Sequence, residues 1–396
     1  MFRKKDGLDL IIRDGRLTAN GTTLGGDNGV AVALMLMVLD DDEIEHPPVE
    51  CVFTTEEEVG LNGAKALDKS VLKARTMINM DSEDEGVATV SCAGGLRVQF
   101  TKEIKRTTVQ GSLLTLKVEG LLGGHSGQDI DKERQNADLL MARMIQRLLK
   151  ETKGQLVSFN GGTKDNAIPR ECEASLIYES DEEAAKAEEL ACELAETYAE
   201  ELTPAEPDFS CEISCETNRT AEAIPQDAAK EFICAMRLAP NGIQKRNIKM
   251  DGFVVVSLNL GVVRTEEDRI VMIFSPRSSV ASLQEDTKER LNTLAETFGF
   301  TVSHSSEYPG WSFKEDSPVR EICKESYKEL FGEDLKIEAI HAGLECGLFS
   351  DAIKGLDAIA IGPTIANCHT PDEYLTLDSF ERFYEFLKDI LSRLAK

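Results

Sequence analysis

The chain lacks three features that would place it in particular classes of protein. No apolar run among its 396 residues is long enough to cross a membrane as a helix. Its 10 cysteines include no Cys-x-x-Cys pair, so free thiols in a reducing cytoplasm are expected. The basic start Met1–Lys5 is followed by Asp6 and Asp9, which interrupt any hydrophobic core of a secretory signal. We therefore expect a cytoplasmic protein.

The chain also has little positive charge. Lysine and arginine number 44 against 71 acidic residues, for a formal net charge of −27. This charge repels nucleic-acid backbones and anionic membrane surfaces, so neither is a predicted partner. An acidic surface also keeps a protein soluble, which accounts for most of the excess. A composition of 41% hydrophobic and 29% charged residues suits one large or two ordinary globular domains.

The stretch Thr54–Gly60 contains three consecutive glutamates and is the most informative local pattern. It follows the apolar run Val49–Phe53, which we interpret as a buried strand. Carboxylates this close repel one another unless a cation lies among them, and oxygen ligands suit a divalent metal. At a turn, Glu57 and Glu58 can divide the work, one binding a metal and the other acting on metal-bound water. The alternative interpretation is a solvated acidic turn.

Two further acidic residues lie at similar junctions. Asp27 follows two glycines and precedes an apolar helix predicted from Val30 to Leu39, so it is either an N-cap or a metal ligand. Asp81 directly follows the predicted strand Met77–Met80. Ligand sites of open α/β sheets lie at the carboxyl ends of the strands. If these strands are parallel neighbours, Asp27, Asp81 and the glutamates gather at one edge.

The pattern of elements predicts an α/β fold with an insertion. The patterns at both ends of the chain predict α/β structure. From about Ser91, stretches of alternating apolar and polar residues predict antiparallel strands followed by helices. We expect a discontinuous α/β catalytic domain at 1–94 and 310–396, interrupted at 95–309 by an α+β domain of ferredoxin-like type. The insertion has two β-α-β-rich halves, so an internal duplication is one interpretation, although no repeat of residues is visible.

Seven motifs together resemble the M20 family of metallopeptidases, and among its branches the aminoacyl-histidine dipeptidases (peptidase D). They occur in the family's order and span nearly the whole chain. A single such motif is weak, but seven in register are specific. The motifs are the glycine-rich 21–29, Thr54–Gly60, Ile78–Asp84, Gly123–Gly127, Asn166–Arg170, His341–Gly347 and His369–Glu373.

The resemblance implies two divalent ions side by side, zinc being favoured over manganese or cobalt. Asp27 would bridge the two ions. Glu58 and His369 would complete one site, and Asp81 would belong to the other. Glu57 is similar to the general base that takes a proton from the bridging water, whose pKa the metals lower.

The resemblance also implies a lid or dimerisation role for the inserted domain. His125 is similar to the histidine that stabilises the tetrahedral oxyanion. Asn166 and Arg277 would hold the backbone and the terminal carboxylate of the substrate, and Gly343 would line the pocket. The implied substrates are short peptides, including Xaa-His dipeptides such as β-alanyl-histidine, and a homodimer is expected.

The chain departs from the family pattern at its start. Family members carry a His-x-Asp motif upstream of the glycine-rich stretch, whereas no histidine precedes His46 here. The site of Asp81 therefore keeps two protein ligands, Asp27 and Asp81, without its usual histidine. We expect a truncated gene model, with exposed strand edges; loss of activity is the alternative. Another M20 amidohydrolase, such as a tripeptidase or deacylase, and a non-catalytic metal-binding remnant are the competing functions.

Overall fold

The computed structural model of the chain describes residues 7–248 and 252–396. The basic segment Met1–Lys5, interpreted above, lies outside the described residues. The chain divides into two compact units, unit 1 comprising Met1–Cys92 with Gly310–Lys396, and unit 2 comprising Ala93–Pro309. None of the helices in the described ranges combines the length and apolar composition needed to cross a bilayer.

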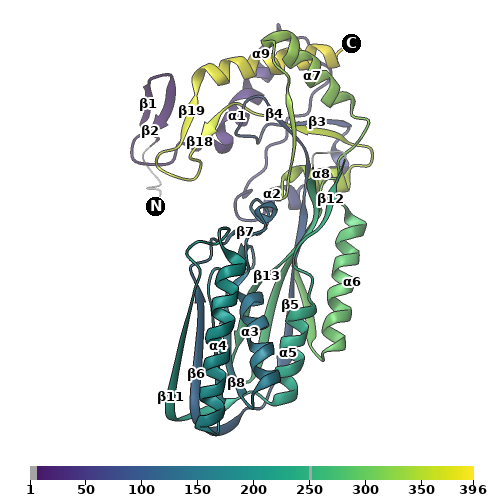
Figure 1. Cartoon of the computed structure of the whole chain (residues 1–396). Coiled ribbons are helices and arrows are strands. Elements are labelled where there is room, and N and C mark those ends of the chain that lie inside the picture. The colour runs from purple at the N-terminus through teal and green to yellow at the C-terminus, as the bar shows by residue number, and fades with distance from the viewer. Residues whose placement is uncertain (1–6, 249–251) are drawn as a thin grey trace. The chain divides into compact units, whose positions relative to one another are not determined.

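Unit 1 contains two small sheets with helices packed on them (Figure 1). One sheet has the order β16-β4-β17-β3 and the other β1-β2-β19-β18. The elements are β1 (Leu10–Arg13), β2 (Arg16–Ala19), α1 (Gly26–Asp40), α2 (Asn62–Ala66), β3 (Thr76–Asn79), β4 (Val87–Cys92), α7 (Pro318–Phe331), β16 (Lys336–Ile340), α8 (Glu345–Ala352), β17 (Asp357–Ala360), β18 (Ile365–Ala366), β19 (Tyr374–Thr376) and α9 (Leu377–Leu394), with a 3₁₀ turn at Lys69–Val71.

The mixed pairing of the first sheet brings two chain segments to one edge. β3 runs parallel to β17, with Asn79 opposite Ala360 at their carboxyl ends. The chain leaves β3 toward Asp81, and it leaves β17 toward the β18–β19 hairpin that carries His369. Parallel strands place such exits on the same side of the sheet. The topology therefore explains how residues almost 300 positions apart in sequence approach one another.

The prediction of a strand at Val49–Phe53 is wrong. Residues 49–54 have no regular secondary structure, and Phe53 is 49% exposed. β3 is the edge strand of its sheet, and this run forms no ladder with it. Instead, the Glu50 carboxylate accepts hydrogen bonds from the amides of Lys73 and Ala74 at 3.0 and 2.9 Å. Apolar composition produces a strand only where a neighbouring strand meets its backbone groups.

Unit 2 is built on one sheet of nine strands, with the order β11-β6-β10-β8-β13-β14-β5-β15 and β12 paired to β13. Its elements are β5 (Gly94–Glu103), β6 (Thr107–Glu119), β7 (Gly124–His125), α3 (Ala137–Glu151), β8 (Gln155–Gly161), β9 (Ala167–Ile168), β10 (Cys172–Tyr178), α4 (Asp181–Leu202), β11 (Ser210–Ala223), α5 (Gln226–Leu238), β12 (Gly242–Asn247), β13 (Phe253–Thr265), β14 (Arg269–Ser278), α6 (Ala281–Thr297) and β15 (Thr301–Tyr308), with a 3₁₀ turn at Ile130–Lys132.

The sheet of unit 2 is a nested pair of ferredoxin-like halves. In the first half, β6-α3-β8-β10-α4-β11 follows the order β-α-β-β-α-β, and its strands lie as 4-1-3-2. The second half, β5-α5-β13-β14-α6-β15, has the same strand arrangement. The first half is inserted between β5 and α5 of the second. The internal duplication considered from the sequence is therefore confirmed at the level of topology.

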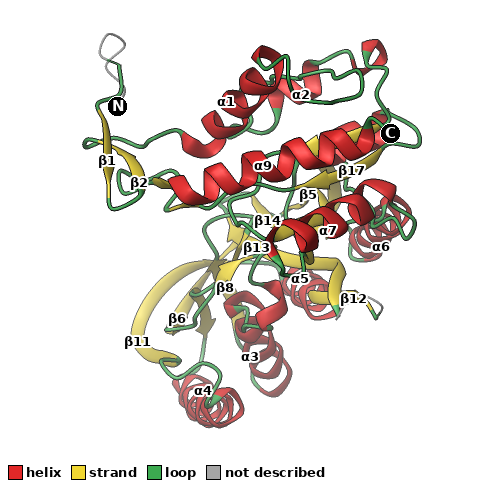
Figure 2. Cartoon of the chain, turned by 90° about the horizontal axis from the view of Figure 1, so that it is seen from above, coloured by secondary structure: helices red, strands yellow, loops and turns green. Residues whose placement is uncertain are grey.

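The helices of unit 2 cover one face of its sheet (Figure 2). A single apolar cluster joins side chains of α3, α4, α5 and α6 to inward-facing strand residues such as Phe100 and Phe274. α3 begins at its cap Asn136, whose side chain accepts the amides of Asp138 and Leu139. Alternate strand residues face the other side, where Ile177 packs with Val109 in a smaller cluster.

Candidate metal centre

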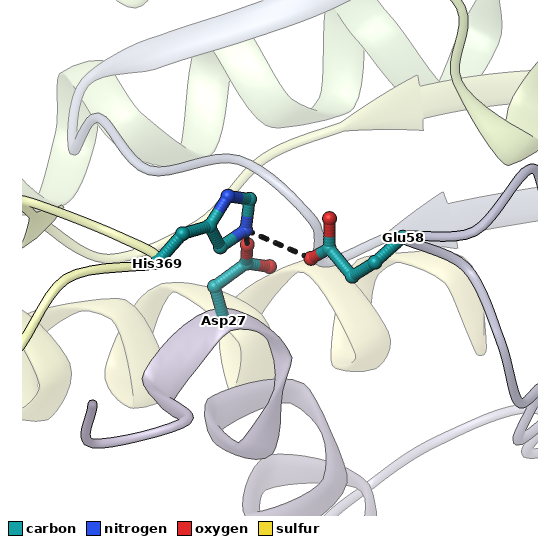
Figure 3. Close-up of side chains that lie close together, drawn as sticks. All are labelled: Asp27, Glu58 and His369. Atoms are coloured by element: carbon teal, nitrogen blue, oxygen red, sulfur yellow. Dashed lines mark hydrogen bonds and ion pairs between the residues drawn. The ribbon is translucent and has the colours of Figure 1, made fainter. Parts of the chain in front are cut away.

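Three predicted ligands converge in unit 1 (Figure 3). The Nε2 atom of His369 lies 3.0 Å from Oδ2 of Asp27 and 2.9 Å from Oε1 of Glu58. One donor atom from each side chain lies within 4.8 Å of the others. The three residues come from the start of α1, the turn before α2 and the β18–β19 hairpin. The fold therefore brings His369 next to Asp27, 342 positions earlier in the sequence, and next to Glu58, 311 positions earlier.

Asp27 is held at an irregular helix start. Both Asp27 and Asn28 depart from helical dihedral angles within α1, and the peptide bond between them is cis. Asn28 Oδ1 accepts the amide of Ala31 at 3.1 Å, which is the bond of a helix cap. The structure thus gives the capping role to Asn28 rather than to Asp27. The Asp27 carboxylate, only 16% exposed, is directed toward His369.

Glu57 and Glu58 lie in a compact turn rather than on an extended chain. Amides of Gly60 and Leu61 both donate to the carbonyl of Glu57, at 3.0 and 2.8 Å. Glu56 has a positive φ of 57°, which reverses the chain direction at this point. The turn directs Glu58 to His369, while Glu57 contributes to the cavity beside Asp27. Glu58 thus contacts His369 and Glu57 does not, a difference in position that would allow the two glutamates the different roles that the sequence indicated.

The loop of the β18–β19 hairpin presents His369, whose φ is +65°. Burial acts to lower the pKa of His369, but the carboxylates of Asp27 and Glu58 outweigh it and raise that pKa. The imidazole can thus carry a proton between two carboxylates. A metal ion at the same position would displace this proton, because only the neutral imidazole binds metal.

Asp81 lies next to this group at the floor of a cavity of about 480 Å³, which Asp27, Glu57, Glu58 and Glu345 also line. Asn28 Nδ2 donates to Asp81 Oδ1 at 2.8 Å. Burial, followed by the charges of Asp27 and Glu57, raises the pKa of Asp81 to about 7. The pKa of Glu57 is raised by burial and by neighbouring carboxylates in the same way. These shifts indicate a site with more negative charge than its own cations balance.

The donor set fits a divalent cation. Two carboxylates and an imidazole are ligands that zinc and manganese accept. The raised pKa of the half-buried Asp81 is the independent observation, because burial and then the charges of Asp27 and Glu57 disfavour its ionised form where a cation would lie. Asp81 offers further carboxylate oxygens beside this group.

A second grouping shares Asp27 with Glu83 and Cys368, whose donor atoms also lie within 4.8 Å of one another. Burial and the charge of Glu83 raise the pKa of the Cys368 thiol to about 12. The thiol is therefore protonated and donates to Glu83. This is a hydrogen-bonded support beside the centre rather than a thiolate ligand.

The predicted substrate residues His125, Asn166 and Arg277 gather within unit 2. The β7 residue His125 pairs with Ala167, and Ser126 donates to the carbonyl of Asn166 at 2.9 Å. Burial and the positive charge of Arg277 lower the pKa of His125. Its Nδ1 accepts the amides of Gly127 and Gln128, at 3.2 and 3.0 Å, so the neutral ring carries its proton on Nε2. His125 is thus a hydrogen-bond donor at Nε2.

Arg277 is 7% exposed and donates from Nη1 to the Tyr308 hydroxyl at 3.0 Å. Its buried Nε has no hydrogen-bond partner among the described residues. A buried guanidinium with an unmet donor has capacity for an anionic ligand.

Gly343, which belongs to unit 1, lies two residues before Glu345 in the segment between β16 and α8.

Three residues that the sequence did not single out contribute to the centre. Glu345 lies in the same motif as Gly343, and its position in the cavity follows from the start of α8. Asn28 is adjacent to Asp27, and its preference for helix caps was a usable signal. Glu373 is the last residue of the motif His369–Glu373, but nothing in the sequence indicates that its carboxylate is buried.

The raised pKa values generate a prediction about the metal-free protein. Groups with a folded pKa above the unfolded one contribute stability below the unfolded value and lose it as pH rises through the folded value. For Asp81 that window runs from about pH 4 to about pH 7. We expect the melting temperature in chelator to fall across this window, and Asp81→Asn to flatten the fall.

Saturating zinc should raise the melting temperature most at the upper end of the window. An ion present at about 1,000 times its Kd contributes about 4 kcal/mol. Scanning calorimetry at several pH values, with chelator and with zinc, measures both effects. A metal-free melting temperature that does not change between wild type and Asp81→Asn at any pH would contradict this electrostatic account.

The comparisons with known proteins agree with this geometry. A model of peptidase family M20/M25/M40 matches residues 3–393. Cytosol non-specific dipeptidase of Escherichia coli (strain K12) is 34% identical over 396 residues, which cover 98% of this chain and 80% of that protein. Aminoacylhistidine dipeptidase from Vibrio alginolyticus has a solved structure that matches with a TM-score of 0.94 and 35% identity, covering 98% of this chain and 79% of that one.

The fold is also shared more widely. Aminopeptidase PepT from Bacillus cereus ATCC 10987 matches with a TM-score of 0.52 at 16% identity, over 100% of this chain and 78% of that one, which shows a likeness of fold alone. The family match, by contrast, extends over nearly the whole sequence. The family predicted from the seven motifs is thereby confirmed: the chain belongs to peptidase family M20/M25/M40 and is a metal-dependent hydrolase of peptide bonds.

Proposed function

We propose that the chain is a cytoplasmic dipeptidase that uses zinc, with manganese or cobalt as alternatives, to hydrolyse short peptides, Xaa-His dipeptides among them. The convergence of Asp27, Glu58 and His369 is the observation that carries the proposal. The names of the relatives from E. coli and V. alginolyticus support dipeptides and aminoacyl-histidines as substrates. All ten cysteines are free thiols, which fits a reducing cytoplasm.

In this proposal Asp27, Glu58 and His369 hold one ion, and Asp27 and Asp81 hold the second. Bound ions of this kind lower the pKa of water and polarise a carbonyl group. The hydrogen bond from Asn28 to Asp81 and the turn that carries Glu58 keep the donors pointing inward.

Glu57 is the proposed general base. It lines the cavity but makes neither of the two contacts to His369 Nε2, which come from Asp27 and Glu58. Burial and the neighbouring carboxylates raise its pKa, which brings its affinity for a proton closer to that needed near neutral pH. A carboxylate in this environment can accept a proton from water and return it to the leaving amine.

Unit 2 is proposed to act as the lid. His125, as a neutral Nε2–H donor, suits an oxyanion. Arg277 suits the C-terminal carboxylate of a peptide, and Asn166 offers an exposed amide side chain for its backbone. A homodimer through unit 2 is part of the proposal. It is supported by the edge strand β11, whose 14 residues end the sheet and are largely exposed.

Glu345 is proposed to select peptides with a free N-terminus. It lines the cavity with Glu57, and its charge helps to raise the pKa of both Glu57 and Asp81. Thr54 Oγ1 donates to Glu345 Oε1 at 2.9 Å, which fixes the carboxylate. A dipeptide carries an ammonium group close to its scissile bond, whereas an N-acyl amino acid does not. An anchored carboxylate here therefore favours a dipeptidase over the deacylase alternative.

Replacing Glu57 tests the catalytic assignment. We expect Glu57→Gln to lower kcat for β-alanyl-histidine and other dipeptides by at least about 10²-fold, because proton transfer is lost. Metal content by elemental analysis should stay at the wild-type value. Glu56→Gln, an exposed neighbour, is the matched control. Full turnover in Glu57→Gln would refute the base, and a metal-free wild type would favour the non-catalytic remnant.

Replacing Glu345 tests the substrate class. Loss of a charge-assisted hydrogen bond to the substrate ammonium should reduce kcat/KM for dipeptides by about 10- to 100-fold. Turnover of the matching N-acetylated dipeptide, slow in wild type, should not fall. Glu333→Gln, on the exposed turn after α7, controls for the change in net charge. Equal losses on both substrates would show that Glu345 acts on the centre itself rather than on the ammonium.

A further inference from the structure

Glu373 is a buried carboxylate for which the mechanism above has no use. It lies at the end of the β18–β19 hairpin loop and is 1% exposed. Its Oε1 accepts the amides of Gly26 and Asp27, at 2.7 and 3.2 Å. Its Oε2 accepts the amide of Gly25 at 3.0 Å and the hydroxyl of Thr23. Four donors from one short loop thus converge on a single side chain.

These donors belong to the glycine-rich loop that leads into α1, ahead of its cap Asn28. Gly25, the residue before α1, makes no side-chain capping bond. Amides that precede the first regular helical turn have no intrahelical acceptor, so a carboxylate there meets otherwise unpaired donors. Glu373 therefore holds the loop that leads into α1, from 347 residues away.

The loop sequence allows this close approach. Gly25 has φ +71°, a conformation that side chains rarely adopt. A Cβ on Gly26 would lie 3.2 Å from Oε1 of Glu373 and 3.3 Å from a methyl group of Leu24. Leu24 and Ile365, 6% exposed each, shield the carboxylate from water. Shielding strengthens each of its hydrogen bonds.

Glu373 also connects two of the proposed ligands. His369 is four residues earlier in the same loop, which the bonds from Thr370 to Asn367 and from Glu373 to Thr370, at 3.3 and 3.2 Å, close into two turns. At the other end, Glu373 binds the amide of Asp27 directly. One carboxylate therefore fixes the backbone that presents Asp27 against the backbone that presents His369.

We infer that Glu373 is a positioning residue that sets the distance and orientation of Asp27 relative to His369 and thereby determines metal affinity. The inference rests on the proposed metal site, since it assigns Glu373 no contact with an ion or a substrate. Supporting residues of this kind orient ligands, and their loss typically weakens metal binding by about 10- to 100-fold.

The test is the zinc dissociation constant of the full chain, measured by competition with a chromophoric chelator. We expect Glu373→Ala to weaken zinc binding by about 10- to 100-fold. Glu373→Gln should weaken it less, because its carbonyl oxygen can still accept some of the loop amides. Gly26→Ala disturbs the same contact from the other side and should also weaken binding. Asp372→Asn, an exposed acidic neighbour in the same loop, is the matched control and should bind as wild type does.

A second measurement separates positioning from general stability. The rise in melting temperature on adding zinc should shrink in Glu373→Ala and Glu373→Gln relative to Asp372→Asn. A variant that melts earlier without metal but keeps the wild-type zinc affinity would overturn the inference, as would unchanged affinity in all variants. If Glu373→Ala does not fold, Glu373→Gln and Gly26→Ala decide by the same criterion. If wild type itself binds no zinc, the proposed metal site fails first and the inference falls with it.

Discussion

Repulsion among carboxylates is the interaction on which the rest of unit 1 depends. Asp27, Glu57, Glu58, Asp81 and Glu345 all border one cavity. His369 is placed between two of them, and burial with neighbouring charge raises the pKa of Asp81 to about 7. A fold that holds this many acidic groups together needs a cation to balance them. A family of metal-dependent peptidases provides the reason for keeping such a costly arrangement.

Hydrogen bonds from the Asn28 side chain and from backbone amides hold these groups in place. Asn28 both caps α1 and donates to Asp81, so a single amide orients a helix and a carboxylate. Glu373 meets the amides of the glycine-rich loop, and the turn at Glu57 directs its neighbour Glu58 toward His369. In unit 2, the tautomer of His125 is fixed in the same way by two backbone amides. Backbone hydrogen bonds thus fix the orientation of these side chains and, for His125, the tautomer.

Local sequence patterns predict many of the helices and strands, whereas strand pairing and the partners of buried side chains depend on contacts between distant parts of the chain. Composition and periodicity predict a strand at Cys172–Tyr178 and helices at Asp181–Leu202 and Leu377–Leu394, and β10, α4 and α9 have these bounds. The prediction of a strand at Val49–Phe53 failed because a strand forms only with a hydrogen-bonded partner, which the sequence does not reveal. The sequence patterns predict no strand at Thr301–Tyr308, where β15 lies, because its residues are largely polar and exposed at the edge of the sheet. Glu373 was missed because its four donors lie about 350 positions away.

The central claim, that the acidic cluster is a metal centre, is tested most directly by locating the ion. Crystals of the chain grown with zinc should give an anomalous diffraction peak about 2.0–2.2 Å from oxygen atoms of Asp27 and Glu58 and from Nε2 of His369. A second peak between Asp27 and Asp81 would fit the second ion of the proposal. A peak confined to other residues, or the pair of carboxylates still hydrogen-bonded to His369 at saturating zinc, would contradict the account.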